Sequence, residues 1–215
     1  MDLARFIDAT ILKPDTTIAD IKKLREDARK HEFVAVCVPP FFVKDAVKAL
    51  EGTPVIISTV VGFPMGYSAT PAKVEEIKKA IDEGATELDC VINICAVKSK
   101  QWNYVRNEID SMAMACQMRG KTIKLILETG LLTEAEIAKL CEMATEVKVN
   151  FVKTSTGVNG KGATVKIVES LRKKLPASIK IKASGGIRDR KLAEELIAAG
   201  AERIGTSAGT TIING

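Results

Sequence analysis

Aromatic residues and histidines are scarce in this sequence, and their scarcity excludes several classes of protein. Aromatic residues make up 4% of the 215 residues, and no run of lysine and arginine is interleaved with them. A nucleic-acid groove with stacking platforms is therefore not expected. The five cysteines form no Cys-x-x-Cys pair and there is one histidine, so no zinc-binding pattern is present. We expect no metal and no cofactor.

Long hydrophobic runs are also missing. No apolar run approaches the ~18 residues that a membrane span requires, so we expect no membrane contact. The N-terminal residues do not have the pattern of a signal peptide, and the dispersed cysteines suit a reducing cytosol. We therefore expect a cytoplasmic protein. The net charge of +5 is mild and suits a small anionic ligand such as a phosphate ester.

Short apolar stretches alternate with helical patterns along the whole chain. The expected strands cover residues 6–12, 33–38, 55–63, 87–93, 122–129, 150–156, 179–183 and 202–207. The expected helices cover residues 18–30, 43–50, 70–83 with Thr70 as N-cap, 99–119, 133–148 with a Thr133/Glu136 capping box, 163–175, and 190–199 capped by Asp189.

This alternation predicts parallel strands joined by right-handed crossovers. Eight units within ~200 to 250 residues favour a closed (β/α)8 barrel, the TIM barrel, formed as one domain by residues 1–215. An open, doubly wound sheet is the alternative, because periodicity cannot show closure. The usual dinucleotide fingerprint, Gly-x-Gly-x-x-Gly after the first strand, is absent.

Two lysines stand at the ends of apolar strands. They occur in the stretches Phe151-Val152-Lys153-Thr154-Ser155-Thr156-Gly157 and Ile179-Lys180-Ile181-Lys182-Ala183-Ser184-Gly185-Gly186-Ile187-Arg188. Burial at a strand's mouth disfavours the ammonium form, and a neutral amine can form a Schiff base with a carbonyl. A second ammonium at Lys182 would disfavour a charge on Lys153 further. The alternative interpretation is two ordinary surface lysines.

Other polar side chains are expected at the same end of the barrel. In this fold the catalytic side chains come from the C-terminal ends of the strands, where Asp8, Cys37 and Asp89 also fall. Asp8 and Thr10 share one face of the first strand by alternation. Asp89 interrupts an apolar strand, where a carboxylate is costly unless it is paired or catalytic. A purely structural aspartate is the alternative.

Glycine-bearing turns follow the last three expected strands. They contain Thr156-Gly157, Ser184-Gly185-Gly186 and Gly205-Thr206-Ser207. Bare glycine amides at a helix start can bind an anion, and the last two turns occupy a common phosphate position in this fold. Arg188 could add a positive charge. Each turn taken singly could instead be only a tight connection.

These motifs together resemble the deoxyribose-phosphate aldolases. The matching stretches are residues 60–64, 87–93, 151–157, 182–188 and 203–207. The resemblance implies a class I, metal-free aldolase on a TIM barrel. By position, Lys153 resembles the Schiff-base lysine, Lys182 the second lysine that tunes it, and Asp89 the acid/base carboxylate. We expect Asp8, Thr10, Cys37 and Thr154 to support them.

The resemblance also implies a reaction and a setting. The reaction is reversible cleavage of 2-deoxy-D-ribose 5-phosphate to acetaldehyde and D-glyceraldehyde 3-phosphate, in deoxyribonucleoside catabolism. The partners would be a phosphorylated sugar and aldehydes, with the phosphate held by Thr156, Gly157, Gly185, Gly186, Arg188, Gly205 and Ser207. A homodimer is expected from the resemblance alone.

Three positions differ from the pattern of the family's bacterial members. Ala9, Pro39 and Ala208 replace a frequent histidine, a common polar residue and a usual second serine. Two other functions stay open at this point: another Schiff-base sugar-phosphate aldolase, and a non-catalytic barrel that only binds a sugar phosphate.

Overall fold

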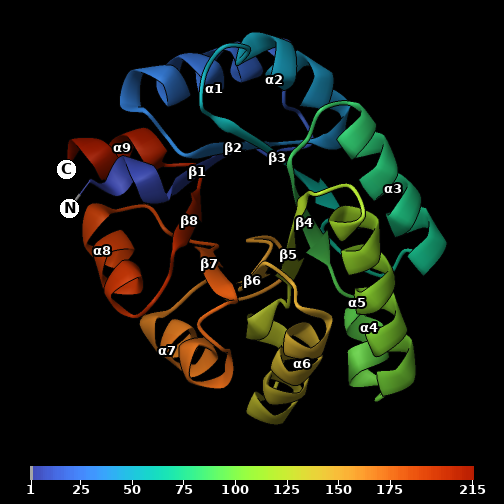
Figure 1. Cartoon of the computed structure of the whole chain (residues 1–215). Helices are drawn as coiled ribbons and strands as arrows, with labels where there is room; N and C mark the ends of the chain where they lie inside the picture. The colour runs from blue at the N-terminus through green and yellow to red at the C-terminus, as the bar shows by residue number, and fades with distance from the viewer. Residues whose placement is uncertain (1) are drawn as a thin grey trace.

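Eight parallel strands close into a barrel at the centre of the computed structural model, which describes residues 2–215 (Figure 1). The strands are β1 (Ile7–Thr10), β2 (Ala35–Val38), β3 (Ile56–Val61), β4 (Glu87–Val91), β5 (Thr122–Ile126), β6 (Phe151–Lys153), β7 (Lys180–Ser184) and β8 (Arg203–Thr206). They pair in chain order, and β8 pairs with β1. The predicted TIM barrel is confirmed, and the open sheet is excluded.

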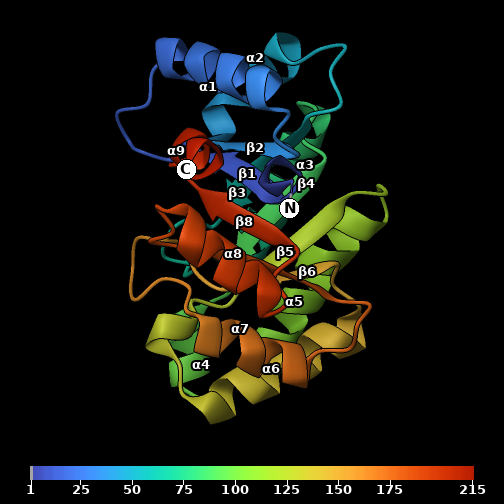
Figure 2. The ribbon, with the colours of Figure 1, turned by 90° about the vertical axis from the view of Figure 1, so that its left-hand side faces the viewer.

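Helices surround the strands. They are α1 (Ile18–His31), α2 (Val43–Ala49), α3 (Thr70–Asp82), α4 (Ile94–Lys98), α5 (Trp102–Gln117), α6 (Glu134–Val147), α7 (Val165–Lys174), α8 (Arg190–Ala198) and α9 (Gly209–Asn214). Short 3-10 turns are η1 (Leu3–Phe6), η2 (Pro40–Phe42) and η3 (Thr129–Leu131). In the side view of Figure 2, α1 and α2 lie at the top and α6 at the bottom, with the strands between them.

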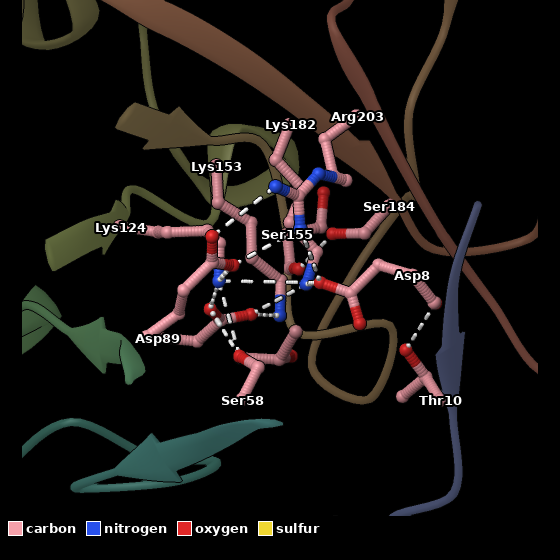
Figure 3. Close-up of polar contacts among 12 residues, drawn as sticks. Asp8, Thr10, Ser58, Asp89, Lys124, Lys153, Ser155, Lys182, Ser184 and Arg203 are labelled. Atoms are coloured by element: carbon pink, nitrogen blue, oxygen red, sulfur yellow. Dashed lines mark hydrogen bonds and ion pairs between the residues drawn. The ribbon is translucent and has the colours of Figure 1, made fainter. Parts of the chain in front are cut away.

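Alternation along each strand separates an apolar layer from a polar interior. In β5, Ile123 and Leu125 are fully buried in the core between strands and helices. Lys124 stands between them and is also fully buried, but it faces the inside of the barrel (Figure 3). The inside of such a barrel is usually filled by branched apolar side chains. Here charged side chains occupy part of it, so the barrel interior is a candidate for a functional site.

Side-chain caps fix where several helices begin. The Thr133 hydroxyl of α6 accepts a hydrogen bond from the Glu136 N–H, and the Glu136 carboxylate accepts one from the Thr133 N–H at 2.7 Å. Asp189 accepts a hydrogen bond from the Leu192 N–H at 2.9 Å at the start of α8. Both predicted caps are therefore confirmed. Each cap satisfies backbone donors that a helix start leaves unpaired.

The predicted helix over residues 99–119 is wrong in its extent. Helix α5 (Trp102–Gln117) is shorter than predicted, and the separate helix α4 (Ile94–Lys98), which was not predicted, precedes it. Lys100 between them adopts a left-handed conformation with φ 57°, which interrupts the helical hydrogen bonds. Asn93, which was predicted to end the strand, caps α4 by accepting a hydrogen bond from the Ala96 N–H at 3.1 Å.

Smaller differences concern the starts and ends of elements. Ala69, not Thr70, is the N-cap of α3, and the Thr70 hydroxyl donates instead to the Tyr104 hydroxyl at 3.4 Å. The strand expected from residue 6 begins at Ile7 after the turn η1. Helix α9 was not predicted; it packs beside η1 and β1 near the start of the chain (Figure 1).

Candidate active site

Lys153 ends the short strand β6 and points into the barrel, where only 2% of its surface is exposed. Its Nζ donates to Asp89 Oδ2 at 2.7 Å (Figure 3). Lys153 also lines a cavity at the C-terminal mouth of the barrel. The amine is therefore sheltered from bulk water but accessible to a small molecule in that cavity.

Asp89, on β4, is the centre of the site. Its Oδ2 accepts hydrogen bonds from Lys153 and from Lys182, the latter at 2.8 Å. Its Oδ1 accepts from Lys124 Nζ at 2.7 Å and from Ser58 Oγ at 3.2 Å. Burial by itself would raise the pKa of Asp89, but the charges of Lys124, Lys153 and Lys182 outweigh it and hold that pKa well below the ordinary value. The carboxylate is thus ionised.

Lys182, on β7, is fully buried between two carboxylates. It donates to Asp8 Oδ2 in a short ion pair and to Asp89 Oδ2 at 2.8 Å. Burial disfavours its ammonium, but Asp8 and Asp89 outweigh burial and raise the pKa of Lys182 above its ordinary value. Lys182 is therefore a permanent cation beside Lys153, and the structure brings together the predicted Lys153, Lys182, Asp89 and Asp8.

Sequence reasoning missed a second group of charges in the interior. Lys124 Nζ lies 2.7 Å from Glu87 Oε2, and Arg203 forms a two-pronged pair with Glu87 at 3.0 and 3.2 Å. Arg203 also lies 3.7 Å from Asp8. Signals for them existed: Lys124 interrupts an apolar strand, and Glu87 stands two residues before Asp89 and so shares its face.

The residues predicted to support the site do so in different ways. The Thr10 hydroxyl donates to the Asp8 carbonyl at 2.9 Å, beside the cavity. The Thr154 hydroxyl donates to the Ser184 carbonyl and accepts from the Ser184 N–H, both at 3.0 Å, and so ties β6 to β7. Burial, with help from the Asp89 carboxylate, raises the pKa of Cys37 to about 11. Cys37 is therefore a neutral thiol.

A cavity of about 370 Å³ lies above Lys153. All the residues predicted to bind phosphate line it: Thr156, Gly157, Gly185, Gly186, Arg188, Gly205 and Ser207. Its wall holds the cations Lys13 and Arg188, and none of the described residues that line it is acidic. A cavity with this lining suits an anionic ligand.

Glycine is required at several of these positions. Gly185 and Gly186 have φ of 92° and 76°, which other residues rarely adopt. A Cβ on Gly205 would come within 2.8 Å of Lys182 Cε, so glycine there leaves room for the lysine. The glycine turns thus expose backbone beside the cavity, and Gly205 leaves room for the Lys182 side chain.

Thr156 lines the cavity, but its polar groups are already bonded. Its hydroxyl donates to the buried carboxylate of Glu128 in a short hydrogen bond, and its N–H lies 3.2 Å from both oxygens of Glu128. The hydroxyl also accepts from the Val158 N–H at 3.1 Å. Thr156 therefore shapes the turn after β6 and has little capacity left for a phosphate, unlike the prediction.

Comparison with known proteins identifies the family. A model described as DeoC/LacD family aldolase matches residues 4–214 of the chain. The chain belongs to the DeoC/LacD aldolase family. It is 45% identical over 215 residues to deoxyribose-phosphate aldolase 1 of Oceanobacillus iheyensis, covering 100% of this chain and 97% of that protein. It is 47% identical over 216 residues to the deoxyribose-phosphate aldolase of Thermococcus kodakarensis, covering 100% and 96%.

Solved structures agree with this assignment. A putative deoxyribose-phosphate aldolase from Coccidioides immitis superposes with a TM-score of 0.94 at 38% identity, over 99% of this chain and 85% of that one. The deoxyribose phosphate aldolase from Aeropyrum pernix, whose structure is described as a unique tetramer, gives a TM-score of 0.92 at 31% identity, over 99% and 89%.

The positions that differ from the DeoC/LacD pattern now have a structural context. Ala9 is buried in the core outside the barrel, so its side chain does not enter the charged interior. Pro39 precedes the turn η2 and lines a second hollow beside the cavity. The Ala208 N–H donates to Thr206 Oγ1 at 2.9 Å. None of the three replacements alters the contacts of Lys153, Lys182 or Asp89.

Two further findings concern the described residues 2–215 of this DeoC/LacD family member. They contain no group of three or more histidine, cysteine, aspartate and glutamate side chains arranged to hold a metal ion. Among the helices that they form, none is both long enough and apolar enough to cross a membrane.

Proposed function

We propose that this aldolase reversibly cleaves 2-deoxy-D-ribose 5-phosphate to acetaldehyde and D-glyceraldehyde 3-phosphate, through a Schiff base on Lys153. The family membership and the full-length similarity to proteins named deoxyribose-phosphate aldolase support the reaction. The observation that carries the role of Lys153 is the balance of charge around it.

The interior balances its charges without Lys153. Asp8, Glu87 and Asp89 supply three carboxylates, and Lys124, Lys182 and Arg203 supply three cations that are ion-paired with them. A proton on Lys153 would add an uncompensated charge to this buried group, which is costly. The neutral amine, which is the nucleophilic form, is the one that leaves the interior balanced.

The first chemical steps take place at Lys153. Its neutral amine attacks the C1 aldehyde of the open-chain sugar, and loss of water together with uptake of one proton from solvent leaves a protonated imine. That imine withdraws electrons, so the C2–C3 bond breaks once the C3 hydroxyl has lost its proton. D-glyceraldehyde 3-phosphate leaves, and an enamine of acetaldehyde stays on Lys153. Protonation of the enamine at carbon and hydrolysis then release acetaldehyde and restore the amine.

Asp89 is the base that we assign to the C3 hydroxyl, directly or through a water molecule. In the free enzyme its Oδ2 accepts hydrogen bonds from the amine of Lys153 and from the ammonium of Lys182. Imine formation reduces the hydrogens on the Lys153 nitrogen from two to one, which frees acceptor capacity on Oδ2 for the substrate. Lys182 stays charged and stabilises the carboxylate between turnovers.

The cavity above Lys153 supports a phosphate subsite. We assign the phosphate to the glycine turns after β7 and β8, with Arg188 adding charge. Binding the remote end of the sugar there would orient C1 toward the amine. The finding that Thr156 is bonded to Glu128 moves our assignment away from the turn after β6.

The expected dimer comes from the family resemblance, and the expected location from the dispersed cysteines, which suit a reducing cytosol. We propose a homodimer in the cytoplasm. Beside the substrate cavity lies a hollow of about 800 Å³ whose wall includes Phe41, 83% exposed, and Tyr67, 64% exposed. Exposed apolar surface of this kind is often covered by another subunit. Light scattering of the purified protein would give twice the mass of one chain for a dimer, and any other multiple would contradict it.

The direct test of function is release of acetaldehyde from 2-deoxyribose 5-phosphate, coupled to an alcohol dehydrogenase. Ribose 5-phosphate is the control substrate, because its C2 hydroxyl would make the two-carbon product glycolaldehyde instead of acetaldehyde. We expect turnover of the deoxy sugar only. Equal turnover of both would indicate another Schiff-base aldolase, and no turnover of either would indicate a barrel that only binds.

A further inference from the structure

Glu87 and Arg203 form a second tier of charge beneath the reacting lysine. Glu87 opens β4 and Arg203 opens β8, and they lie 6% and 6% exposed. Both Glu87 oxygens contact the guanidinium, at 3.0 and 3.2 Å, and Oε2 also lies 2.7 Å from Lys124 Nζ. Lys124 in turn contacts Asp89 at 2.7 Å. The pair is thus linked to Asp89 through one intervening lysine.

Neither side chain of this pair reaches the substrate. The cavity is lined by Lys153 and by residues of the mouth, and neither Glu87 nor Arg203 is among the described residues that line it. The pair therefore cannot bind the sugar or move its protons directly. Its influence on the reaction has to pass through the charges above it.

Every strand contributes to the environment of the Lys153 amine. The interior polar groups are Asp8 on β1, Cys37 on β2, Ser58 on β3, Glu87 and Asp89 on β4, Lys124 on β5, Lys182 on β7 and Arg203 on β8. Above them lie Lys13 and Arg188 in the cavity wall, and Glu128 bonded to Thr156. Neutralising Glu87 raises the net charge of this set by one, and neutralising Arg203 lowers it by one.

We propose that Glu87 and Arg203 are positioning residues that set the pH range of the enzyme. They do so by fixing the net charge of the barrel interior, which determines how readily the Lys153 amine loses its proton. This inference rests on the proposed role of Lys153 as the Schiff-base nucleophile. It predicts that two buried neighbours, which form one ion pair, shift the reaction in opposite directions when each is neutralised.

The test compares the pH dependence of kcat/KM for Glu87→Gln and Arg203→Gln. With Glu87 neutral, the surplus positive charge disfavours the ammonium of Lys153, so the acid limb moves to lower pH. With Arg203 neutral, the surplus negative charge favours the ammonium, and the limb moves to higher pH. We expect each shift to be about one pH unit or less, because Lys124 and Asp89 lie between Glu87 and Lys153 and the interaction weakens with distance.

The contacts indicate that the variants can fold. Without Arg203, Glu87 keeps Lys124 at 2.7 Å, and without Glu87, Lys124 keeps Asp89 at 2.7 Å. The double variant Glu87→Gln/Arg203→Gln restores neutrality and should return the limb to the parent position. Glu87→Asp keeps the charge and should leave the limb in place. If Glu87→Gln does not fold, the acid limbs of Arg203→Gln and of the double variant still test the proposal.

Opposite shifts, with return in the double variant, would support the proposal. An acid limb that stays fixed in Arg203→Gln, or limbs that shift in the same direction in both single variants, would overturn it. A purely structural pair would lower the rate in both variants without shifting their acid limbs in opposite directions. Borohydride trapping on the parent enzyme separates this failure from that of the proposed function. An acetaldehyde adduct on Lys153 with no shift in the variants would refute only the role of Glu87 and Arg203.

Discussion

Replacing Lys182 with leucine tests the electrostatic role that its position indicates. The Nζ atoms of Lys153 and Lys182 lie 2.7 and 2.8 Å from the same oxygen of Asp89, so they are at most about 5.5 Å apart. Two unit charges at that separation repel by about 3 kcal/mol at an effective dielectric constant of about 20, and by about 0.8 kcal/mol in water. Lys182→Leu removes this repulsion and so favours the ammonium of Lys153.

One pH unit corresponds to about 1.4 kcal/mol, so the acid limb of kcat/KM should move upward by about half a unit to two units. The assay is acetaldehyde release across about pH 5–10, with Lys182→Arg as the charge-preserving control. Much of the lost rate should return at alkaline pH.

The result that would refute this reasoning is an unshifted pH profile with a uniformly lower rate. Lys182 would then act by proton transfer or by contact with the substrate. A parent-like pH profile in Lys182→Arg does not by itself support the electrostatic role, because the acid limb of the leucine variant must also shift. Borohydride trapping should still mark Lys153 in the leucine variant.

Three further predictions concern the phosphate of the substrate, a buried ion pair between α3 and α5, and metal ions. Removing the phosphate from the substrate should raise KM and lower kcat, since remote binding energy orients the reacting carbon; equal reaction of 2-deoxyribose would show that the cavity is misassigned. Lys73→Met should lower the free energy of unfolding by about 3–5 kcal/mol in urea titrations, because it leaves the fully buried Glu108 without the partner at 2.8 Å. Lys79→Met, which breaks an exposed pair, should cost under about 1 kcal/mol, and similar losses in both would contradict the argument. Activity should survive EDTA; loss that zinc or magnesium restores would exclude the class I assignment.

The order of the elements could be predicted because each carries its own signal. Buried strands such as Ala35–Val38 are apolar on both faces, and helix starts such as Thr133 carry their caps in the sequence. Closure of the barrel could be favoured but not shown, since it depends on pairing between β1 and β8 at opposite ends of the chain. Helix α4 was missed because five residues are too few to show a periodic pattern, and the left-handed Lys100 that follows it leaves no clear sequence signal.

The upper part of the site could be predicted and the lower part could not. Lys153, Lys182 and Asp89 could be predicted because they lie at strand ends or in stretches that resemble the family's motifs. Lys124, which interrupts an apolar strand, carried a signal that was overlooked, whereas Arg203 stands at a strand start, where an isolated charge usually means a solvated edge. Only the closed barrel shows that side chains of β4, β5 and β8 meet in one interior, and only the three-dimensional structure shows that Glu128 bonds to Thr156.

The central claim is that Lys153 is the nucleophile, and reductive trapping tests it most directly. Acetaldehyde is incubated with the enzyme, borohydride reduces the imine to an N-ethyl amine, and mass spectrometry locates it. We predict one N-ethyl group on Lys153, none in an inactive but folded Lys153→Arg, and no change in Lys180→Arg, whose lysine is exposed at the other end of β7. A modified lysine elsewhere, no adduct at all, or activity of Lys153→Arg within tenfold of the parent would contradict the account.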